Sequence, residues 1–337
     1  MSEGLPDMLV TASAPGKLVL SGEYAVLDGA PAICMAVDRR ARVTISPSTA
    51  EHHTVAAPGF CSTVGSFKTH NGDVEWLAGG GDFRLVDDVW RTANPVVPTS
   101  LAMVLDTSEF LDAKSNAKIG IGSSAALAVA LAAAICELVQ ADADATRVAF
   151  AAHRQFQDGL GSGADVACST AGGLIAYSMA AGAGPQIAWP EGLAHALVWS
   201  GVVTSTGGKL ERFGRQEPRP SRSALVDSAQ RIATAWRGGS VQTILDEYRD
   251  YTHVLREFSI DHGLGIFDAG HAELADAAAA AGVIYKPCGA GGGDVGVVFA
   301  DDEAAVEAFV SNVVPPNFRA LKMSIDRCGV QVDREEH

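Results

Sequence analysis

The sequence predicts a globular α+β protein with two domains, and three observations support this prediction. The chain has 337 residues, of which 47% are hydrophobic and 19% charged, enough for a packed core and for two modest domains. Short apolar and alternating runs typical of strands are mixed with longer runs at helical spacing. A stretch rich in Gly, Ala and Pro at 180–190 indicates a boundary, so we divide the chain into residues 1–185 and 186–337.

Strand signals dominate the start of the chain. Residues 9–12 and 18–20 are apolar runs, which we expect to form one strand interrupted by a turn at residues 14–17. Apolar and polar side chains alternate at residues 40–47, which predicts a half-buried antiparallel strand. The pair Asn71-Gly72 predicts a hairpin turn, because these residues adopt the positive φ angles of a two-residue hairpin loop.

Helix signals follow in the middle of the chain. Three glycines at residues 79–81 predict a flexible loop, and residues 87–110 after them have helical spacing in spite of two prolines. Stronger helix signals lie at residues 124–140 and 144–157. The acidic stretch 142–146 that opens the second of these is typical of an N-cap region.

The second half of the chain mixes strands and helices, and no internal repeat of fixed period is visible. We expect a strand at residues 194–199, helices at 221–236, 241–258 and 270–281, and a strand–turn unit at 283–299.

Composition excludes several classes of function. The formal net charge of -15 argues against a nucleic-acid partner, since phosphate backbones are bound chiefly by clustered Lys and Arg. An anionic substrate would need a local group of cations. Six cysteines without CxxC pairing, together with a start that lacks a secretory signal, indicate a protein of the reducing cytoplasm. No apolar run is long enough to span a bilayer, so we expect no membrane partner and a monomer or homodimer.

The strongest local motif is Gly120-Ile-Gly-Ser-Ser-Ala-Ala-Leu, a glycine loop that runs directly into an Ala-rich helix. Glycines let the backbone approach a phosphate closely, and the free N–H groups at a helix start stabilise an anion. The hydroxyl groups of Ser123 and Ser124 add ligands for phosphate or Mg²⁺. The alternative is a helix start with tight glycine packing and no ligand.

This loop resembles the GLGSSAA phosphate-binding motif of the GHMP kinases, with Ile121 in place of the usual Leu. Two more motifs occur in the order found in that family. Ala14-Pro-Gly-Lys-Leu-Val-Leu-Ser-Gly-Glu-Tyr-Ala-Val-Leu is similar to the first family motif, and Lys286-Pro-Cys-Gly-Ala-Gly-Gly-Gly-Asp-Val-Gly to the third, KPSGAGGGDCG. Three ordered motifs over most of the chain form a highly specific resemblance.

A fourth stretch points to one branch of the family. His153-Arg-Gln-Phe-Gln-Asp-Gly-Leu-Gly-Ser-Gly-Ala-Asp-Val-Ala is similar to the HxxxQxxxGSGxDVA stretch of phosphomevalonate kinases. In mevalonate kinases the matching region carries a Glu on the helix instead, where it helps to hold Mg²⁺. Because imidazole is a poor ligand for this hard cation, the resemblance implies that Mg²⁺ is held by ATP phosphates and a loop serine, Ser124.

The resemblance also implies a fold. The family has an N-terminal α/β domain with a βαβ unit around the phosphate loop and a C-terminal ferredoxin-like α/β domain, with the active site between them. The ligands implied are ATP, Mg²⁺ and a small acceptor, phosphomevalonate or a related anion.

Two residues are implied to be catalytic. Lys17 would reach the transferring phosphoryl oxygens. Asp165 would be either the base or the residue that orients Lys17, and its bland alternative is a helix N-cap. We favour the orienting role, because a phosphomonoester acceptor has a second pKa near ~6 and is largely deprotonated at neutral pH.

The remaining site residues come from the family motifs. We expect Asp294 to face backbone N–H groups, because it would otherwise repel phosphate. The residues implied to bind ATP are Lys118, Gly120, Gly122, Ser123, Ser124 and Ala125. Those implied to bind the acceptor are Ser21, Glu23, Tyr24, His153, Gln157, Ser162, Gly163, Ser205, Thr206, Gly289, Ala290 and Gly291.

The expected function is ATP-dependent phosphorylation of (R)-5-phosphomevalonate to 5-diphosphomevalonate, a step of the mevalonate pathway of isoprenoid biosynthesis. A mevalonate kinase, or another GHMP kinase with a hydroxyl acceptor, is the enzymatic alternative. An inactive binding protein of the same fold is the alternative outside enzymes.

Overall fold

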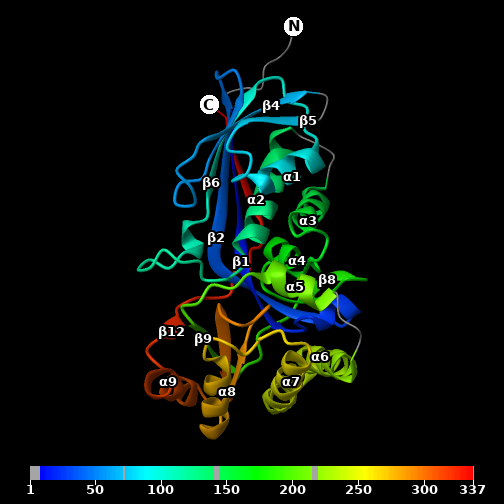
Figure 1. Cartoon of the computed structure of the whole chain (residues 1–337), viewed down its shortest axis with the longest axis vertical. Coiled ribbons are helices and arrows are strands. Elements are labelled where there is room, and N and C mark those ends of the chain that lie inside the picture. Colours follow the sequence, from blue (N-terminus) through cyan, green and yellow to red (C-terminus); the bar gives the residue numbers. More distant parts are fainter. Residues whose placement is uncertain (1–7, 71–72, 140–143, 215–218, 337) are drawn as a thin grey trace.

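The computed structural model describes residues 8–70, 73–139, 144–214 and 219–336, and within these residues it confirms the α+β prediction. Two sheets lie one above the other along the long axis of the molecule (Figure 1). The chain builds most of the upper sheet first and then the lower one. Its last strand returns to the upper sheet, so the start of β1 pairs with the end of β13 in the upper half of Figure 1.

The upper sheet has nine strands in the described part of the chain, and most neighbours in it are antiparallel. Its strands are β1 (Met8–Ser21), β2 (Ala32–Ser48), β3 (His53–Ala56), β4 (Gly65–His70), β5 (Asp73–Ala78), β6 (Ser100–Asp106), β7 (Leu174–Ser178), β8 (Gly182–Gln186) and β13 (Gln331–Glu336).

Strand β1 runs without a break through residues 14–17, so the turn predicted there is wrong. Both halves of β1 pair with β2, and only the register shifts, between Pro15 and Gly16. A bulge of this kind bends a strand without ending it. Gly16 is required there because a Cβ would lie 2.8 Å from the carbonyl oxygen of Ile121.

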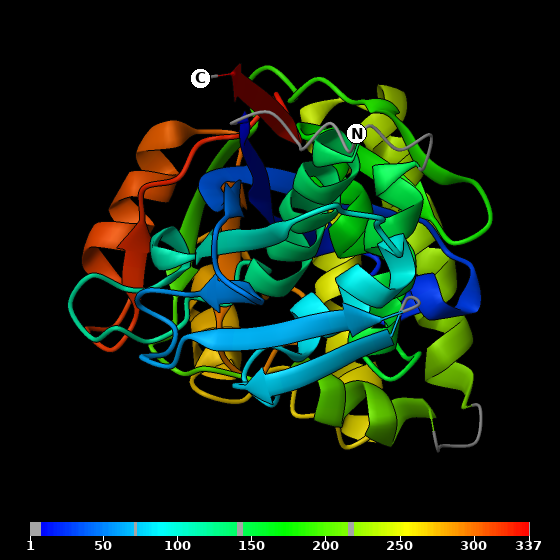
Figure 2. The same ribbon diagram turned by 90° about the horizontal axis from the view of Figure 1, so that it is seen from above.

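Four helices pack on one face of the upper sheet (Figure 1): α1 (Arg84–Ala93), α2 (Ser123–Leu138), α3 (Ala145–Phe156) and α4 (Ala164–Ala171). Helix α2 lies against β1 and β2 and is buried on nearly every side, which explains its almost uniformly apolar sequence. Figure 2 shows the light-blue β4–β5 pair at one side of this layer, where β5 contacts α1.

The expected βαβ unit is present around the glycine loop. Strands β6 and β7 both run antiparallel to β2, so they are parallel to each other, and helices α2 to α4 form the connection between them. The glycine loop precedes α2. This topology places the start of α2 near the middle of the molecule, next to β1.

The lower sheet is antiparallel and contains β9 (Ala194–Trp199), β10 (Ile284–Pro287), β11 (Val295–Ala300) and β12 (Arg319–Leu321). Helices pack around this sheet, and α5 lies at the level where the upper and lower halves of the molecule meet (Figure 1). They are α5 (Thr206–Gly214), α6 (Pro220–Gly238), α7 (Val241–Asp261), α8 (His271–Ala280) and α9 (Glu303–Asn312), and two short 3₁₀ helices occur at Ala25–Asp28 and Ser108–Phe110.

Some local predictions are wrong or fall outside the described residues. Residues 87–110 are not one helix: α1 ends at Ala93, and β6 follows a loop that contains both prolines. Residues 180–190 contain β8, which forms a hairpin with β7, and the boundary that we place between residues 185 and 186 stays a prediction. The predicted turn at 71–72 lies outside the described residues. Within the described ranges, no helix is long and apolar enough to span a membrane.

Candidate active site

The glycine loop leads into α2 as the sequence predicts. Gly120 and Gly122 have φ angles of 91° and 81°, a left-handed conformation that glycine adopts without strain. Gly122 is the N-cap, and Ser123 and Ser124 form the first turn of α2. Backbone N–H groups at this end have no partner inside the helix, and the helix dipole adds positive potential. The geometry therefore suits a bound anion.

All three motifs meet at this loop. The backbone N–H of Lys17 donates to the carbonyl oxygen of Ile121 at 2.8 Å, which fixes β1 against the loop. The Lys17 side chain passes directly over Gly122, where a Cβ would lie 2.7 Å from Lys17 Cε. On the other side, a Cβ on Gly120 would lie 2.2 Å from Cγ of Asp294, in the third motif. Residues far apart in the sequence thus enclose the loop.

Three adjoining pockets flank the loop. The first, the apolar pocket, has Lys118, Ser123 and Ser124 on its rim and is lined chiefly by Ala57, Phe60, Phe83, Leu85, Val86, Leu105, Leu127 and Phe156. The second, the central pocket, also includes Lys118, Ser123 and Ser124 and extends to Ser205 and α5. The third, the Lys17 pocket, shares Gln157 with the central pocket and contains Lys17, Ser162, Asp165, Gly289 and Ala290. The pockets together form a path from Phe60 to Asp165.

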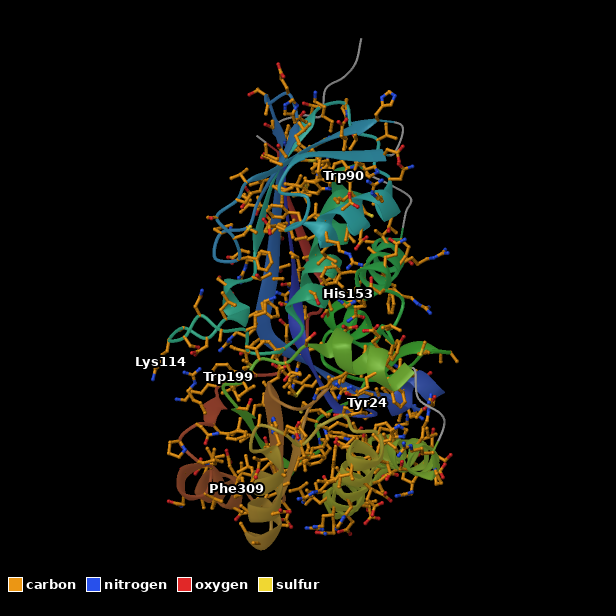
Figure 3. The ribbon with its side chains drawn as sticks, in the orientation of Figure 1. Tyr24, Trp90, Lys114, His153, Trp199 and Phe309 are labelled. Carbon is orange, nitrogen blue, oxygen red and sulfur yellow. The ribbon has the colours of Figure 1, made fainter. Side chains whose placement is uncertain are left out.

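His153 joins the glycine loop to Asp165. Its Nε2 is 3.1 Å from Oγ of Ser124, and its Nδ1 is 3.8 Å from Oδ2 of Asp165. The imidazole is buried, on α3 beside the start of α2 (Figure 3). Ser124, His153 and Asp165 therefore form a connected row between the central pocket and the Lys17 pocket.

Asp165 lies in the first turn of α4, two residues after its N-cap Gly163, so the simple N-cap role does not apply. Its Oδ1 accepts a hydrogen bond from the backbone N–H of Val166 at 3.0 Å. Burial opposes ionisation of Asp165, but the charges of His153 and Lys17 and nearby backbone N–H groups leave its pKa below the ordinary value. The carboxyl group is thus an anion near Lys17, although no ion pair between the two occurs among the described residues.

The loop of the third motif is held from behind by side-chain donors. Lys209 Nζ donates to the carbonyl oxygens of Gly291 at 2.7 Å and Gly265 at 3.2 Å, and the Tyr24 hydroxyl donates to that of Ala290 at 3.0 Å. His271 Nε2 lies 3.0 Å from the carbonyl oxygen of Gly293. These contacts turn the carbonyl oxygens of Ala290, Gly291 and Gly293 toward the side chains of Tyr24, Lys209 and His271.

Glu23 is engaged in a buried ion pair with Lys286, and both side chains have at most 1% of their surface exposed. The Tyr251 hydroxyl donates to Oε2 of Glu23 at 2.6 Å and accepts from the backbone N–H of Gly22 at 2.8 Å. This cluster connects the first motif, the third motif and α7. Lys286, one of the cations near the motifs, is therefore occupied by Glu23.

Comparison with known proteins shows the family to which the chain belongs. A phosphomevalonate kinase of Streptomyces sp. strain CL190 is 33% identical over 341 aligned residues, which cover 87% of this chain and 90% of that protein. The chain belongs to the GHMP kinase family. It is therefore a phosphotransferase, and its relatives place it among the kinases of the mevalonate pathway. The family model of the GHMP kinases N terminal domain matches residues 107–173, which include the glycine loop of this GHMP kinase.

One further sequence relative and one solved structure are similar to this GHMP kinase. A mevalonate kinase of Methanothermobacter thermautotrophicus is 35% identical over 170 residues, half of each chain. The structure of Streptococcus pneumoniae phosphomevalonate kinase in complex with phosphomevalonate and AMPPNP superposes with a TM-score of 0.76 at 18% identity, covering 94% of this chain and 99% of that one. This likeness shows that the chain has the two-domain GHMP kinase fold.

The other residues expected in the site have varied surroundings. Ser162 Oγ accepts from the backbone N–H of Ala164 at 3.3 Å, and Ser205 lines the central pocket. Gln157 ends α3, and within the described chain its buried Oε1 has no hydrogen-bond partner. Ser21 is fully buried at the end of β1, away from the pocket linings. Ala125 is buried in α2, and Thr206 opens α5.

Sequence reasoning missed most of the pocket walls of this GHMP kinase. The apolar pocket is built from single side chains of several segments, among them Phe60, Phe83 and Phe156. Phe60 and Phe83 stand in no motif, and Phe156 lies in the fourth stretch at a position that the HxxxQxxxGSGxDVA pattern leaves open, so no local signal marks them. Leu210 of α5 also lines the Lys17 pocket. Asp294 accepts from the backbone N–H of Thr204 at 3.2 Å, as the sequence argument expects, but its side chain also lies against Gly120, which that argument did not foresee.

Proposed function

We propose that this GHMP kinase transfers the terminal phosphoryl group of ATP to the phosphate of (R)-5-phosphomevalonate, giving ADP and 5-diphosphomevalonate. His153 carries the proposal. It stands between Ser124 and Asp165, within a stretch that resembles phosphomevalonate kinases, in the region where mevalonate kinases carry a metal-binding Glu. The relative from Streptomyces, with 90% of its length covered, bears the name phosphomevalonate kinase.

ATP would lie along the path of pockets. Its base and ribose fit the apolar pocket, beside Phe60 and Leu127, and its phosphates fit the glycine loop at residues 120–126. Ser124 offers a hydroxyl oxygen, a hard ligand suited to Mg²⁺, at the start of α2. When bound with the nucleotide, Mg²⁺ supplies positive charge for the phosphate oxygens.

The acceptor would lie in the Lys17 pocket, whose far wall includes Gly289 and Ala290. Lys17 then stands between donor and acceptor, where its ammonium group can stabilise negative charge as the phosphoryl group moves. Asp165 and His153 supply a fixed polar wall beside it. Because an acceptor phosphate is already deprotonated at neutral pH, Asp165 acts by orientation and not by proton removal.

A mevalonate kinase is the second candidate, and one observation favours it. The pKa of Asp165 stays below its ordinary value although burial raises it, because His153 and Lys17 stabilise the anion. A carboxylate in the acceptor pocket could therefore accept a proton from a hydroxyl group. Several relatives are also named mevalonate kinase.

The two candidates are separated by an assay of ADP release with ATP, Mg²⁺ and one acceptor at a time. Phosphomevalonate, mevalonate and several sugars should be compared at equal concentration, with mass spectrometry of the product. We expect efficient turnover with phosphomevalonate alone and a product heavier by one phosphoryl group. Preferential turnover of mevalonate would replace the proposal with the second candidate.

A further inference from the structure

Asp294 lies against the glycine loop that would hold the phosphates of ATP. Its side chain fills the space beside Gly120, so that a Cβ on that glycine would lie 2.5 Å from Oδ1 of Asp294. A carboxylate at such a place repels phosphate. Asp294 thus needs an explanation that its role as an acceptor for the Thr204 N–H does not provide.

The backbone holds Asp294 in this position. Its N–H donates to the carbonyl oxygen of Val202 at 2.7 Å, and its own carbonyl oxygen accepts from the N–H of Ser200 at 2.9 Å. The neighbouring Gly293 is fixed by His271. With three segments engaged, the side chain stays beside the glycine loop when phosphates arrive.

Two cations face Asp294, Lys17 from β1 and Lys209 from α5. Neither forms an ion pair with it in the described part of the chain, since the Lys209 ammonium is directed to Gly291 and Gly265. Burial raises the pKa of Asp294 to about 6, although the Thr204 N–H and the two lysines lower it in part. A neutral carboxyl group is therefore accessible close to physiological pH.

We propose that Asp294 is a binding residue of the phosphate site that works as a neutral carboxylic acid. Protonated, it donates a hydrogen bond to a phosphate oxygen; ionised, it repels the same oxygen. Binding of a nucleotide at the glycine loop then takes up one proton from solvent. This inference rests on the proposed assignment of residues 120–126 to the phosphates of ATP, and it does not depend on the identity of the acceptor.

Calorimetry with AMPPNP and no acceptor tests the inference. Titrations between about pH 6 and about pH 8, in pairs of buffers with different ionisation enthalpies, give both the affinity and the number of protons taken up. The informative variant is Asp294→Asn, which keeps the shape of the neutral acid. The matched control is Asp268→Asn, which removes one negative charge from an exposed carboxylate near Lys209 but away from the glycine loop.

Near pH 7, we expect AMPPNP binding to wild type and to Asp268→Asn to take up as much as one proton more than AMPPNP binding to Asp294→Asn. If only the neutral acid binds, the wild-type affinity relative to that of Asp294→Asn falls by about 50-fold between pH 6 and pH 8. Smaller losses of at least about fivefold agree with weak binding by the ionised form.

Three results would overturn the inference. They are identical proton uptake in wild type and Asp294→Asn, parallel pH profiles of affinity, and weak binding by the Asn variant at every pH, which would mean that the ionised carboxylate is required. If Asp294→Asn does not fold, wild-type uptake corrected for the ionisation of free AMPPNP decides the question. Failure of wild type to bind AMPPNP would overturn the nucleotide site as well, whereas binding without proton uptake overturns only this inference.

Discussion

At the scale of single residues, Lys17 is distinguished by its position over Gly122 rather than by a partner. Its stem lies on the glycine loop, and its ammonium group, which forms no hydrogen bond or ion pair among the described residues, is left for a ligand. We expect Lys17→Ala to lower kcat by about 100-fold or more and to change KM little, because a charge that matters most in the transition state affects kcat. Steady-state kinetics with both substrates measures this. Lys17→Arg is the control for charge without shape, and a change in KM alone would restrict Lys17 to binding.

Asp165 separates the two kinds of acceptor. With a phosphate acceptor, Asp165→Asn should lose orientation and keep measurable turnover, and its rate should rise through pH ~6 and then level with acceptor ionisation. With a hydroxyl acceptor, the loss of a general base adds ~10²- to 10⁴-fold. The measurement is a pH–rate series of wild type and variant with phosphomevalonate and mevalonate. A wholly inactive Asn variant, together with preference for mevalonate, would contradict the phosphomevalonate assignment.

At the scale of elements, the start of α2 determines where phosphate can bind. Ser124 contributes a hydroxyl there, and His153 fixes its orientation at 3.1 Å. We expect Ser124→Ala to weaken use of Mg²⁺–ATP by ~1 to 3 kcal/mol, the typical cost of a lost charge-assisted contact. The KM for ATP over a series of Mg²⁺ concentrations reports the effect. Ser115→Ala, remote from the pockets, serves as a control, and equal kinetics for both variants would reject the assignment of Ser124.

At the scale of the whole molecule, the buried ion pair of Glu23 and Lys286 links the upper and lower halves. The pair joins the end of β1 to β10, and Tyr251 of α7 completes it. We expect Lys286→Met to lower the free energy of unfolding by ~3 to 5 kcal/mol, because it leaves the Glu23 carboxylate buried without a counter-charge.

The double variant Glu23→Gln with Lys286→Met should recover much of that loss, since no unpaired charge is then buried. Denaturant unfolding of the wild type, both single variants and the double variant measures the coupling. Additive losses in the double variant would mean that the ion pair contributes no coupling.

The sequence by itself determined features that depend on neighbouring residues. Helix α2 and strand β9 lie close to their predicted positions, and Asp144 caps α3 by accepting from the backbone N–H of Thr146 at 2.9 Å. The loop into α2 was also predictable, because glycine freedom and helix starts are local properties. The domain boundary between residues 185 and 186 stays a prediction. Strand β8, which ends at Gln186, belongs to the upper sheet, and the next strand, β9, belongs to the lower sheet.

Tertiary structure alone decided which of these residues meet. Pro15 and Gly16 suggest a turn, yet β1 continues through them because β2 pairs with both of its halves. In the sequence Lys286 resembles a cation available to a ligand. In the structure it is buried in an ion pair with Glu23, 263 residues away, and has a structural role. Asp294 likewise receives its place from contact with Gly120. Such pairings depend on contacts between distant segments, for which a single sequence carries no local signal, so the chemistry of the site follows from the fold.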